Sequence, residues 1–227
     1  MVPRDVDAGQ IPLALSVLQI LALDIGTDLL PALALGAEPP EPGVMERPPR
    51  PRSARSLDRA VLARAFGFLG PVEAIASLAM LPVGAALFLG WHAGTPLPTG
   101  GPALATLSTM VFAAIVLAQM ANAFECRSTV TSLRALGPAT NRLLVGAVAG
   151  KFLILLGFVY LGPMQQLLGH QPLTLIQWVA VLAAPMLLLA AEETRKAVAR
   201  RRRRATAGPI GPEPPGHQTL RRRAAAV

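Results

Sequence analysis

Charged residues, aromatic residues and cysteine are all scarce in this sequence of 227 residues. Charged side chains make up 15% of it, against about a quarter in a typical soluble domain, and aromatic side chains make up 4%. The single cysteine, Cys126, excludes a disulfide framework within the chain and leaves no partners for a cysteine metal cluster. No Gly-x-x-x-x-Gly-Lys-Ser/Thr segment is present, which excludes a phosphate-binding loop of that type.

Apolar residues, by contrast, make up 52% of the sequence, and its mean hydropathy is +0.48. They gather in segments long enough to cross a bilayer as helices, for which about 20 residues suffice. We therefore predict an all-α membrane protein built as a bundle of five transmembrane helices. The predicted spans are residues 11–36, 65–91, 103–124, 143–162 and 173–191.

Lysine and arginine are missing from two of the gaps between these spans, residues 92–102 and 164–172. Since basic loops stay on the cytoplasmic side, this asymmetry predicts a multi-pass protein of the cell membrane, with its N-terminus outside and its C-terminus in the cytoplasm. It also accounts for most of the net charge of +8. No aromatic residues interleave with the arginines, so we expect the lipid bilayer, and no nucleic acid, as a partner. The basic residues lie in the other two gaps (Arg47, Arg50, Arg52, Arg55, Arg59, Arg64; Arg127, Arg134, Arg142) and in the tail (Arg195, Lys196, Arg200 to Arg204).

Outside the spans, the composition favours extended or disordered chain. Residues 36–52 hold six prolines, too many for a helix, and are expected to form an extended cytoplasmic loop. Residues 1–10 are predicted to be a disordered N-terminal tail and residues 205–227 a disordered basic tail. The ordered transmembrane domain is therefore expected over residues 11–204.

Two carboxylates, Asp24 and Asp28, interrupt the first apolar segment. A charged side chain at membrane depth costs roughly 2.5–3.5 kcal/mol even on lenient scales, and residues four apart share one face of a helix. Pro31 cannot donate a backbone hydrogen bond, so the carbonyl of Thr27 loses its helical partner, and Gly26 loosens the same turn. Two carboxylates, a hydroxyl and a free carbonyl on one turn predict half of an oxygen site for a hard cation. The alternative, a soluble helix with two exposed acids, conflicts with the apolar residues on its other sides.

Three other kinds of polar residue lie in or near the spans. Glu73 is interpreted as a partly solvated acid that pairs with Arg64 or a loop arginine, with a hydrogen-bonding role inside the bundle as the alternative. Lys151 is expected to snorkel toward the cytoplasmic interface, with a buried pair with an acid or a built-in counter-charge as alternatives. His92 and His170 are expected to be plain loop residues.

The segment Leu-Asp-Ile-Gly-Thr-Asp-Leu-Leu-Pro-Ala-Leu-Ala-Leu-Gly at residues 23–36, with the proline-rich segment after it, resembles the sixth transmembrane helix and following loop of type II P-type cation-transporting ATPases. Gln-Met-Ala-Asn-Ala-Phe at 119–124 resembles the eighth helix of that family. Glu-Glu-Thr-Arg-Lys-Ala-Val-Ala-Arg-Arg at 192–201 resembles the motif that closes its tenth helix. The resemblance covers residues 11–204 and implies the C-terminal transmembrane domain, helices six to ten.

By this resemblance, Asp24, Thr27 and Asp28 match cation-coordinating positions of the sixth helix. Gln119 matches a position on the eighth helix, and with Asn122, three residues on, it is a candidate for a secondary cation site or for helix packing. Without the resemblance, interhelical hydrogen bonds are the simpler role for Gln119 and Asn122, and ligation is the alternative.

The sequence contains no Asp-Lys-Thr-Gly-Thr phosphorylation segment. The resemblance therefore implies a cation pathway without the phosphorylation, nucleotide-binding and actuator domains, as a split-pump subunit or a truncated fragment. We expect this chain alone to be inactive as an ATPase and to hold no cofactor, since ATP and Mg²⁺ would bind the missing domains. A separate chain with those domains and the first five helices is the expected partner, and the transported metal cation is unidentified. The alternative is a non-catalytic membrane scaffold, regulator or passive ion pathway.

Overall fold

The computed structural model describes residues 12–38, 49, 58–128, 131–137 and 140–206. These residues fold into helices, and no strand occurs among them. Five helical segments in the described part are long and apolar enough to cross a membrane, which confirms the predicted all-α membrane bundle. They are Val17–Gly36, Arg59–Leu89, Gly101–Glu125, Arg142–Tyr160 and Leu175–Arg202.

Four of these segments are built from more than one element or carry a short helix beside them. The helices are α1 (Val17–Gly26), α2 (Leu29–Gly36), α3 (Arg59–Arg64), α4 (Gly70–Leu78), α5 (Met80–Leu89), α6 (Gly101–Glu125), α7 (Leu133–Leu136), α8 (Arg142–Tyr160), α9 (Gly162–Leu168), α10 (Leu175–Val181) and α11 (Ala183–Thr206), with a π-helical turn at Ala65–Leu69 between α3 and α4.

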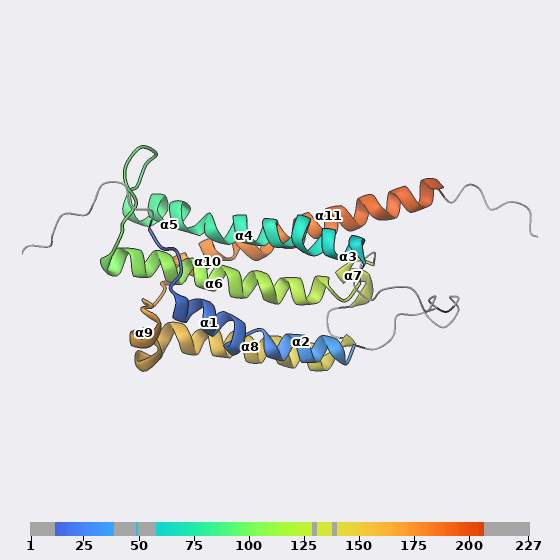
Figure 1. Ribbon diagram of the computed structural model, residues 1–227, viewed down its shortest axis with the longest axis horizontal. Coiled ribbons are helices and arrows are strands. Elements are labelled where there is room, and N and C mark those ends of the chain that lie inside the picture. The colour runs from blue at the N-terminus through green and yellow to red at the C-terminus, as the bar shows by residue number, and fades with distance from the viewer. Residues whose placement is uncertain (1–11, 39–48, 50–57, 129–130, 138–139, 207–227) are drawn as a thin grey trace, which may run out of the picture.

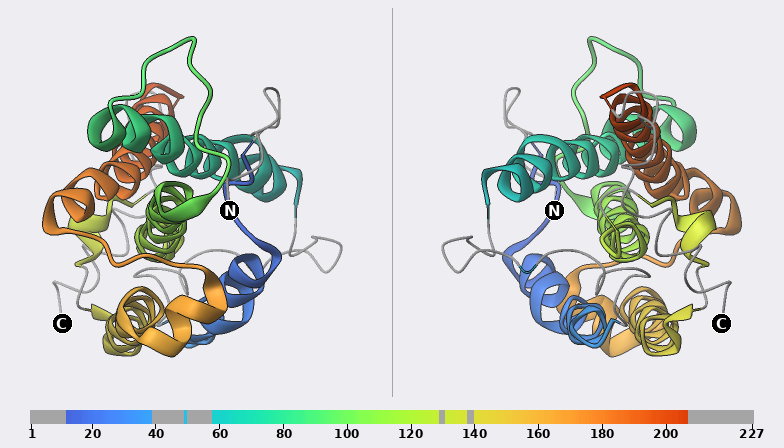
Figure 2. Two further views of the ribbon diagram at one scale, coloured as in Figure 1. Left: turned by 90° about the vertical axis from the view of Figure 1, so that its left-hand side faces the viewer. Right: turned by 90° about the vertical axis from the view of Figure 1, so that its right-hand side faces the viewer.

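Helix α6 is the centre of the bundle. Figure 2, which looks along the bundle from its two ends, shows α6 between α4, α5 and α11 on one side and α1, α2 and α8 on the other. Five consecutive residues, Met110 to Ala114, are fully buried, so this helix is covered on every side. Its sequence explains the position, because a helix with apolar or small residues all round has no polar face to turn to water.

Prolines set the places where the other spans are interrupted. A proline removes the hydrogen bond to the carbonyl four residues earlier, and its ring clashes with that carbonyl. Each break in a helix lies close to the residue whose carbonyl loses its partner, four positions before a proline. That residue is either within the break or immediately before it. The pairs are Thr27 and Pro31 between α1 and α2, Gly67 and Pro71 in the π-helical turn, Leu78 and Pro82 between α4 and α5, and Val181 and Pro185 between α10 and α11.

The predicted gap at residues 164–172 contains structure that the sequence analysis missed. Helix α9 occupies Gly162–Leu168 and ends at Gly169, whose positive φ of 68° suits a residue without a side chain. His170 follows it and is only 3% exposed, so the expectation of a plain loop residue is wrong there. Its Nδ1 donates to the carbonyl of Phe158 at 3.1 Å, and its ring packs edge-on against Phe112.

The ends of the chain and the proline-rich loop lie largely outside the described residues. The predicted tail at 1–10 lies outside them, and so does most of the loop at 36–52. Helix α11 continues to Thr206, so the first two residues of the tail predicted for 205–227 are helical, and the remainder lies outside the described part.

Candidate cation site

The interruption between α1 and α2 places Thr27 and Asp28 at non-helical positions in the middle of the first span. Thr27 is buried, and its backbone N–H and its hydroxyl both donate to the carbonyl of Leu23, at 3.2 and 2.7 Å. The hydroxyl hydrogen is thus used within the same helix, while the hydroxyl oxygen keeps a lone pair. The carbonyl of Thr27 has no N–H to meet at Pro31, as the sequence predicts.

Asp28 joins two other helices through a ring of three polar side chains. Lys151 Nζ on α8 donates to Asp28 Oδ1 at 2.6 Å, and Gln119 Nε2 on α6 donates to Asp28 Oδ2 at 3.1 Å. Lys151 Nζ also donates to Gln119 Oε1 at 2.9 Å, which closes the ring. Each member of this ring is therefore satisfied by the other two, as a polar group inside a membrane bundle requires.

The expectation that Lys151 snorkels to the interface is wrong. Its side chain is 1% exposed, and it forms a buried pair with an acid, the first of the two alternatives. An ammonium within the bundle needs an opposite charge and hydrogen-bond acceptors nearby. Asp28 and Gln119 supply both, so the stem of Lys151 does not need to reach water.

Asp24 is placed differently from Asp28. The helix ends at Gly26, between the two aspartates, so the four-residue helical spacing does not relate them. Asp24 is exposed, and no described residue hydrogen-bonds to it, whereas Asp28 turns toward α6 and α8. The two carboxylates therefore present one inward-facing and one outward-facing oxygen donor on the same broken span.

Glu73 on α4 contributes a third carboxylate to this region. It is half-buried and close enough to Asp28 and Lys151 to interact electrostatically with both. Arg64, one of its two expected kinds of partner, instead donates to Glu192 at 2.6 Å and to the carbonyl of Glu125 at 3.3 Å, while the loop arginines between residues 47 and 55 lie outside the described residues. Glu73 thus lies within electrostatic reach of the polar ring and is not paired with Arg64.

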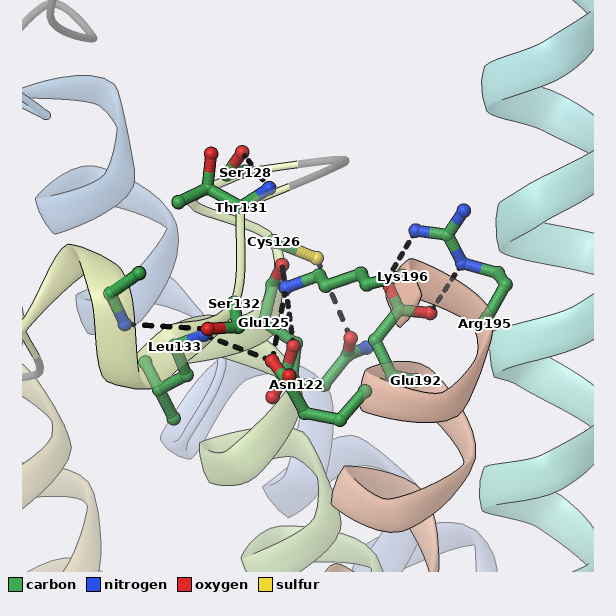
Figure 3. A network of polar contacts seen from close by, with 12 residues as sticks. Asn122, Glu125, Cys126, Ser128, Thr131, Ser132, Leu133, Glu192, Arg195 and Lys196 are labelled. Carbon is green, nitrogen blue, oxygen red and sulfur yellow. Dashed lines mark hydrogen bonds and ion pairs between the residues drawn. The ribbon is translucent and has the colours of Figure 1, made fainter. Parts of the chain in front are cut away.

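The two candidate residues on α6 separate in the structure. Gln119 belongs to the ring around Asp28, which gives it the interhelical hydrogen bonds that its residue type favours. Asn122 instead accepts from the thiol of Cys126 at 3.5 Å, beside a second polar cluster drawn in Figure 3. Within the described residues, no group of three or more His, Cys, Asp or Glu side chains converges as a metal site. The side chains brought together around Asp28 are one carboxylate, one amide and one ammonium.

The second polar cluster joins the end of α6 to α11 and α3, and we call it the end clamp (Arg64, Glu125, Glu192, Arg195 and Lys196). Lys196 donates to both the carboxylate and the carbonyl of Glu125, and the side chains of both residues are fully buried (Figure 3). Arg195 donates two hydrogen bonds to Glu192, at 2.8 and 2.7 Å, and Arg64 reaches the same carboxylate. This clamp ties the last residues of α3 and α6 to the middle of α11.

The fold and the polar ring define a multi-pass membrane protein whose broken first span carries oxygen donors at membrane depth. Residues 12–198 match the family described as cation transporting ATPase, C-terminus. The chain belongs to this family, which confirms the resemblance to the C-terminal transmembrane domain of type II P-type cation-transporting ATPases.

Curated relatives cover most of this chain, but the chain covers less than a fifth of their length. It is 38% identical over 176 residues to a calcium-transporting ATPase of Bacillus subtilis, with 76% of the chain and 18% of that protein aligned. It is 30% identical over 156 residues to calcium-transporting ATPase type 2C member 2 of Mus musculus, with 69% and 15% aligned. A shorter match, 38% over 68 residues, relates 30% of the chain to 7% of the sodium/potassium-transporting ATPase subunit alpha-3 of Gallus gallus.

Proposed function

We propose that this chain forms the membrane-embedded cation-pathway portion of a P-type cation pump. Asp24, Thr27 and Asp28 supply cation ligands, and Gln119 supplies a further oxygen. The observation that carries the proposal is the interruption of the first span at Thr27 and Asp28. Such breaks expose main-chain carbonyls and polar side chains at membrane depth, where they serve ion sites in other transport proteins.

The site needs ligands from outside the described residues. A hard cation such as Ca²⁺ takes about six to eight oxygen ligands, more than Asp24, Thr27, Asp28 and Gln119 provide. Asp24 lies on a face of α1 and α2 that is largely exposed and otherwise apolar, with Val17 at 79% and Ile25 at 68% exposure. A charge left on that face would meet lipid at a cost of roughly 2.5–3.5 kcal/mol. A further transmembrane helix with its own oxygen donors, packed on this face, would remove that cost and complete the site.

We assign that further helix to a partner that carries the phosphorylation, nucleotide-binding and actuator domains together with the first five helices, on a separate chain. ATP and Mg²⁺ bind there. In this arrangement the assembly lies in the cell membrane, with the N-terminus of this chain outside and its basic tail in the cytoplasm. Two of the relatives are calcium-transporting ATPases by name, so Ca²⁺ is the first cation to test.

The experiment reconstitutes the chain with its candidate partner in vesicles and measures cation uptake and cation-dependent ATP hydrolysis. Asp24→Asn and Asp28→Asn should each reduce the apparent cation affinity, while the chain alone hydrolyses no ATP. Asp58→Asn is the matched control, because Asp58 is an exposed helix cap that Asn can also form. Unchanged affinity in both site variants would remove these aspartates from the pathway and favour a non-catalytic scaffold or regulator.

A further inference from the structure

We propose that Lys151 is an internal cation that holds the place of a metal cation at Asp28 and competes with it. The inference deepens the proposed function, on which it rests for the nature of the competing ion. It concerns how cation binding at Asp28 is regulated, and it gives Lys151 on α8 a specific partner and competitor, where the sequence offers a built-in counter-charge only as an alternative to snorkelling.

The contacts of Lys151 are those of a cation bound by oxygen. Its ammonium lies 2.6 Å from Asp28 Oδ1 and 2.9 Å from Gln119 Oε1. These are the oxygens that a metal cation at Asp28 would need, and with the ammonium in place neither is free to ligate a second cation from the same side. Gln119 Nε2 also donates to Asp28 Oδ2, which occupies the other carboxylate oxygen.

The surroundings of the pair fit competition better than a purely structural role. Lys151 is 1% exposed, whereas Asp28 is 41% exposed, so an ion can approach the carboxylate and displace the ammonium from it. Glu73 places a second carboxyl group within electrostatic reach of both Asp28 and Lys151, so a further oxygen donor lies close to the pair. The lysine stem is flexible and its ammonium makes single, replaceable contacts, unlike the fixed fork of an arginine.

This arrangement separates the two aspartates by function. Asp24 has no bound partner among the described residues and is open to the first contact with a cation. Asp28 accepts a cation only when the ammonium of Lys151 withdraws. A metal cation therefore binds at Asp28 only at a concentration high enough to displace the ammonium of Lys151.

The test compares the full-length wild-type chain with Lys151→Met in lipid nanodiscs and follows thermal unfolding by tryptophan fluorescence. Each protein is measured in calcium, sodium or potassium chloride, with choline chloride of equal ionic strength as the reference. Methionine removes the ammonium and keeps an unbranched side chain, so the carboxylate of Asp28 loses its positively charged partner. We expect at least one metal chloride to raise the melting temperature of Lys151→Met by about 5 °C over choline and to leave the wild type unchanged.

Two controls locate the effect at Asp28. The rise in melting temperature with metal chloride should disappear in Asp28→Asn/Lys151→Met, which has no carboxylate at residue 28 for the metal. It should also be absent in Lys196→Met, which removes the other fully buried lysine of the described residues but leaves the ring around Asp28 intact. Where Lys151→Met does not fold in choline, Lys151→Gln replaces it, because its amide can still donate to Asp28.

The outcomes separate this inference from the proposed function. A metal-dependent rise in the melting temperature of Lys151→Met that is lost when Asp28 is also replaced supports competition between Lys151 and a metal cation. Equal melting temperatures in metal and choline, an equal metal response in the wild type, or failure of both lysine variants to fold even with metal would overturn it. Each of those results leaves the transport measurements on Asp24→Asn and Asp28→Asn to decide the proposed function separately.

Discussion

Lys196 donates to both the side chain and the main-chain carbonyl of Glu125, and neither side chain is exposed. The two residues lie 71 positions apart, at the end of α6 and within α11. An ion pair removed from water in this way repays its desolvation only while both charges are present and hydrogen-bonded. The end clamp is therefore sensitive to the loss of either partner.

Lys196→Met should destabilise the bundle by about 3–5 kcal/mol, because it leaves Glu125 as an uncompensated buried charge. Lys196→Met/Glu125→Leu should recover much of that loss, since both charges are then gone. Chemical denaturation in detergent micelles measures the difference. Arg142→Met, which removes an exposed cation, is the control and should change stability little. A double variant no more stable than Lys196→Met would contradict the pairing.

Gly26→Ala should weaken the contact between α1 and α8. A methyl group at residue 26 would lie 3.0 Å from Cζ of Phe158 and 3.2 Å from its Cε2. We expect a loss of about 1–3 kcal/mol from overpacking, measured by the unfolding midpoint. The matched control is Gly36→Ala, where nothing lies within 4 Å and the better helix propensity of alanine should stabilise by up to about 1 kcal/mol.

The contact with Phe158 is tested by adding Phe158→Leu, which shortens the side chain that the new methyl group meets. Gly26→Ala should cost less stability in that background than in the wild type. Equal losses in the two backgrounds would show that the strain at Gly26 has another source.

His170 should make the bundle less stable in acid. Burial lowers the pKa of His170 below its ordinary value of 6.5, and the hydrogen bond to Phe158 offsets this only in part. Its Nε2 is buried and has no hydrogen-bond partner among the described residues, so a proton there would find no acceptor. The unfolded chain binds that proton more readily than the folded chain. Burial of neutral His170 therefore costs no stability above pH 6.5, and the folded state loses stability as the pH drops from 6.5 toward the lower pKa of folded His170.

The measurement is the melting temperature of wild type and His170→Gln between pH 5 and 8, a range of about one to two units around the ordinary histidine pKa. The loss in acid should be smaller in His170→Gln. His92→Gln is the control, because His92 is exposed and should leave the pH profile of the wild type unchanged. Parallel profiles for wild type and His170→Gln would assign the acid sensitivity elsewhere.

Cysteine labelling should test the predicted orientation. In a Cys126→Ser background, Ala93→Cys lies in the turn after α5 and Arg59→Cys lies at the start of α3, at opposite ends of one span. A membrane-impermeant maleimide should label residue 93 on intact cells and residue 59 only after permeabilisation. The reversed pattern would contradict the orientation, and labelling of both from one side would contradict the crossing itself.

Much of this architecture is local and therefore predictable from the sequence. The length of the apolar segments predicts the five spans, which the structure confirms. Their interruptions follow from Pro31, Pro71, Pro82 and Pro185, because the lost hydrogen bond always falls four residues earlier. The position of Asp28 within an apolar span also follows from its neighbours alone, and the break in the helix at this turn follows from Pro31.

The partners of the buried charges depend on the tertiary structure. Lys151 and Asp28 are 123 positions apart, and snorkelling was the simpler interpretation for a lysine near a helix end. His170 lies in a polar gap of the sequence, yet it is buried, with its ring against Phe112 and its Nδ1 bonded to the carbonyl of Phe158.

The sequence by itself thus determined the membrane class, the family, the spans and the interrupted turn at Thr27 and Asp28, close to Asp24. Only the tertiary structure decided that Asp28 faces Gln119 and Lys151 while Asp24 faces outward. The physical reason is that helix formation and its interruption depend on hydrogen bonds within four residues, whereas a charge pair depends on which helix faces meet. That choice is made by the packing of α1, α2 and α8 around α6, and no local pattern encodes it.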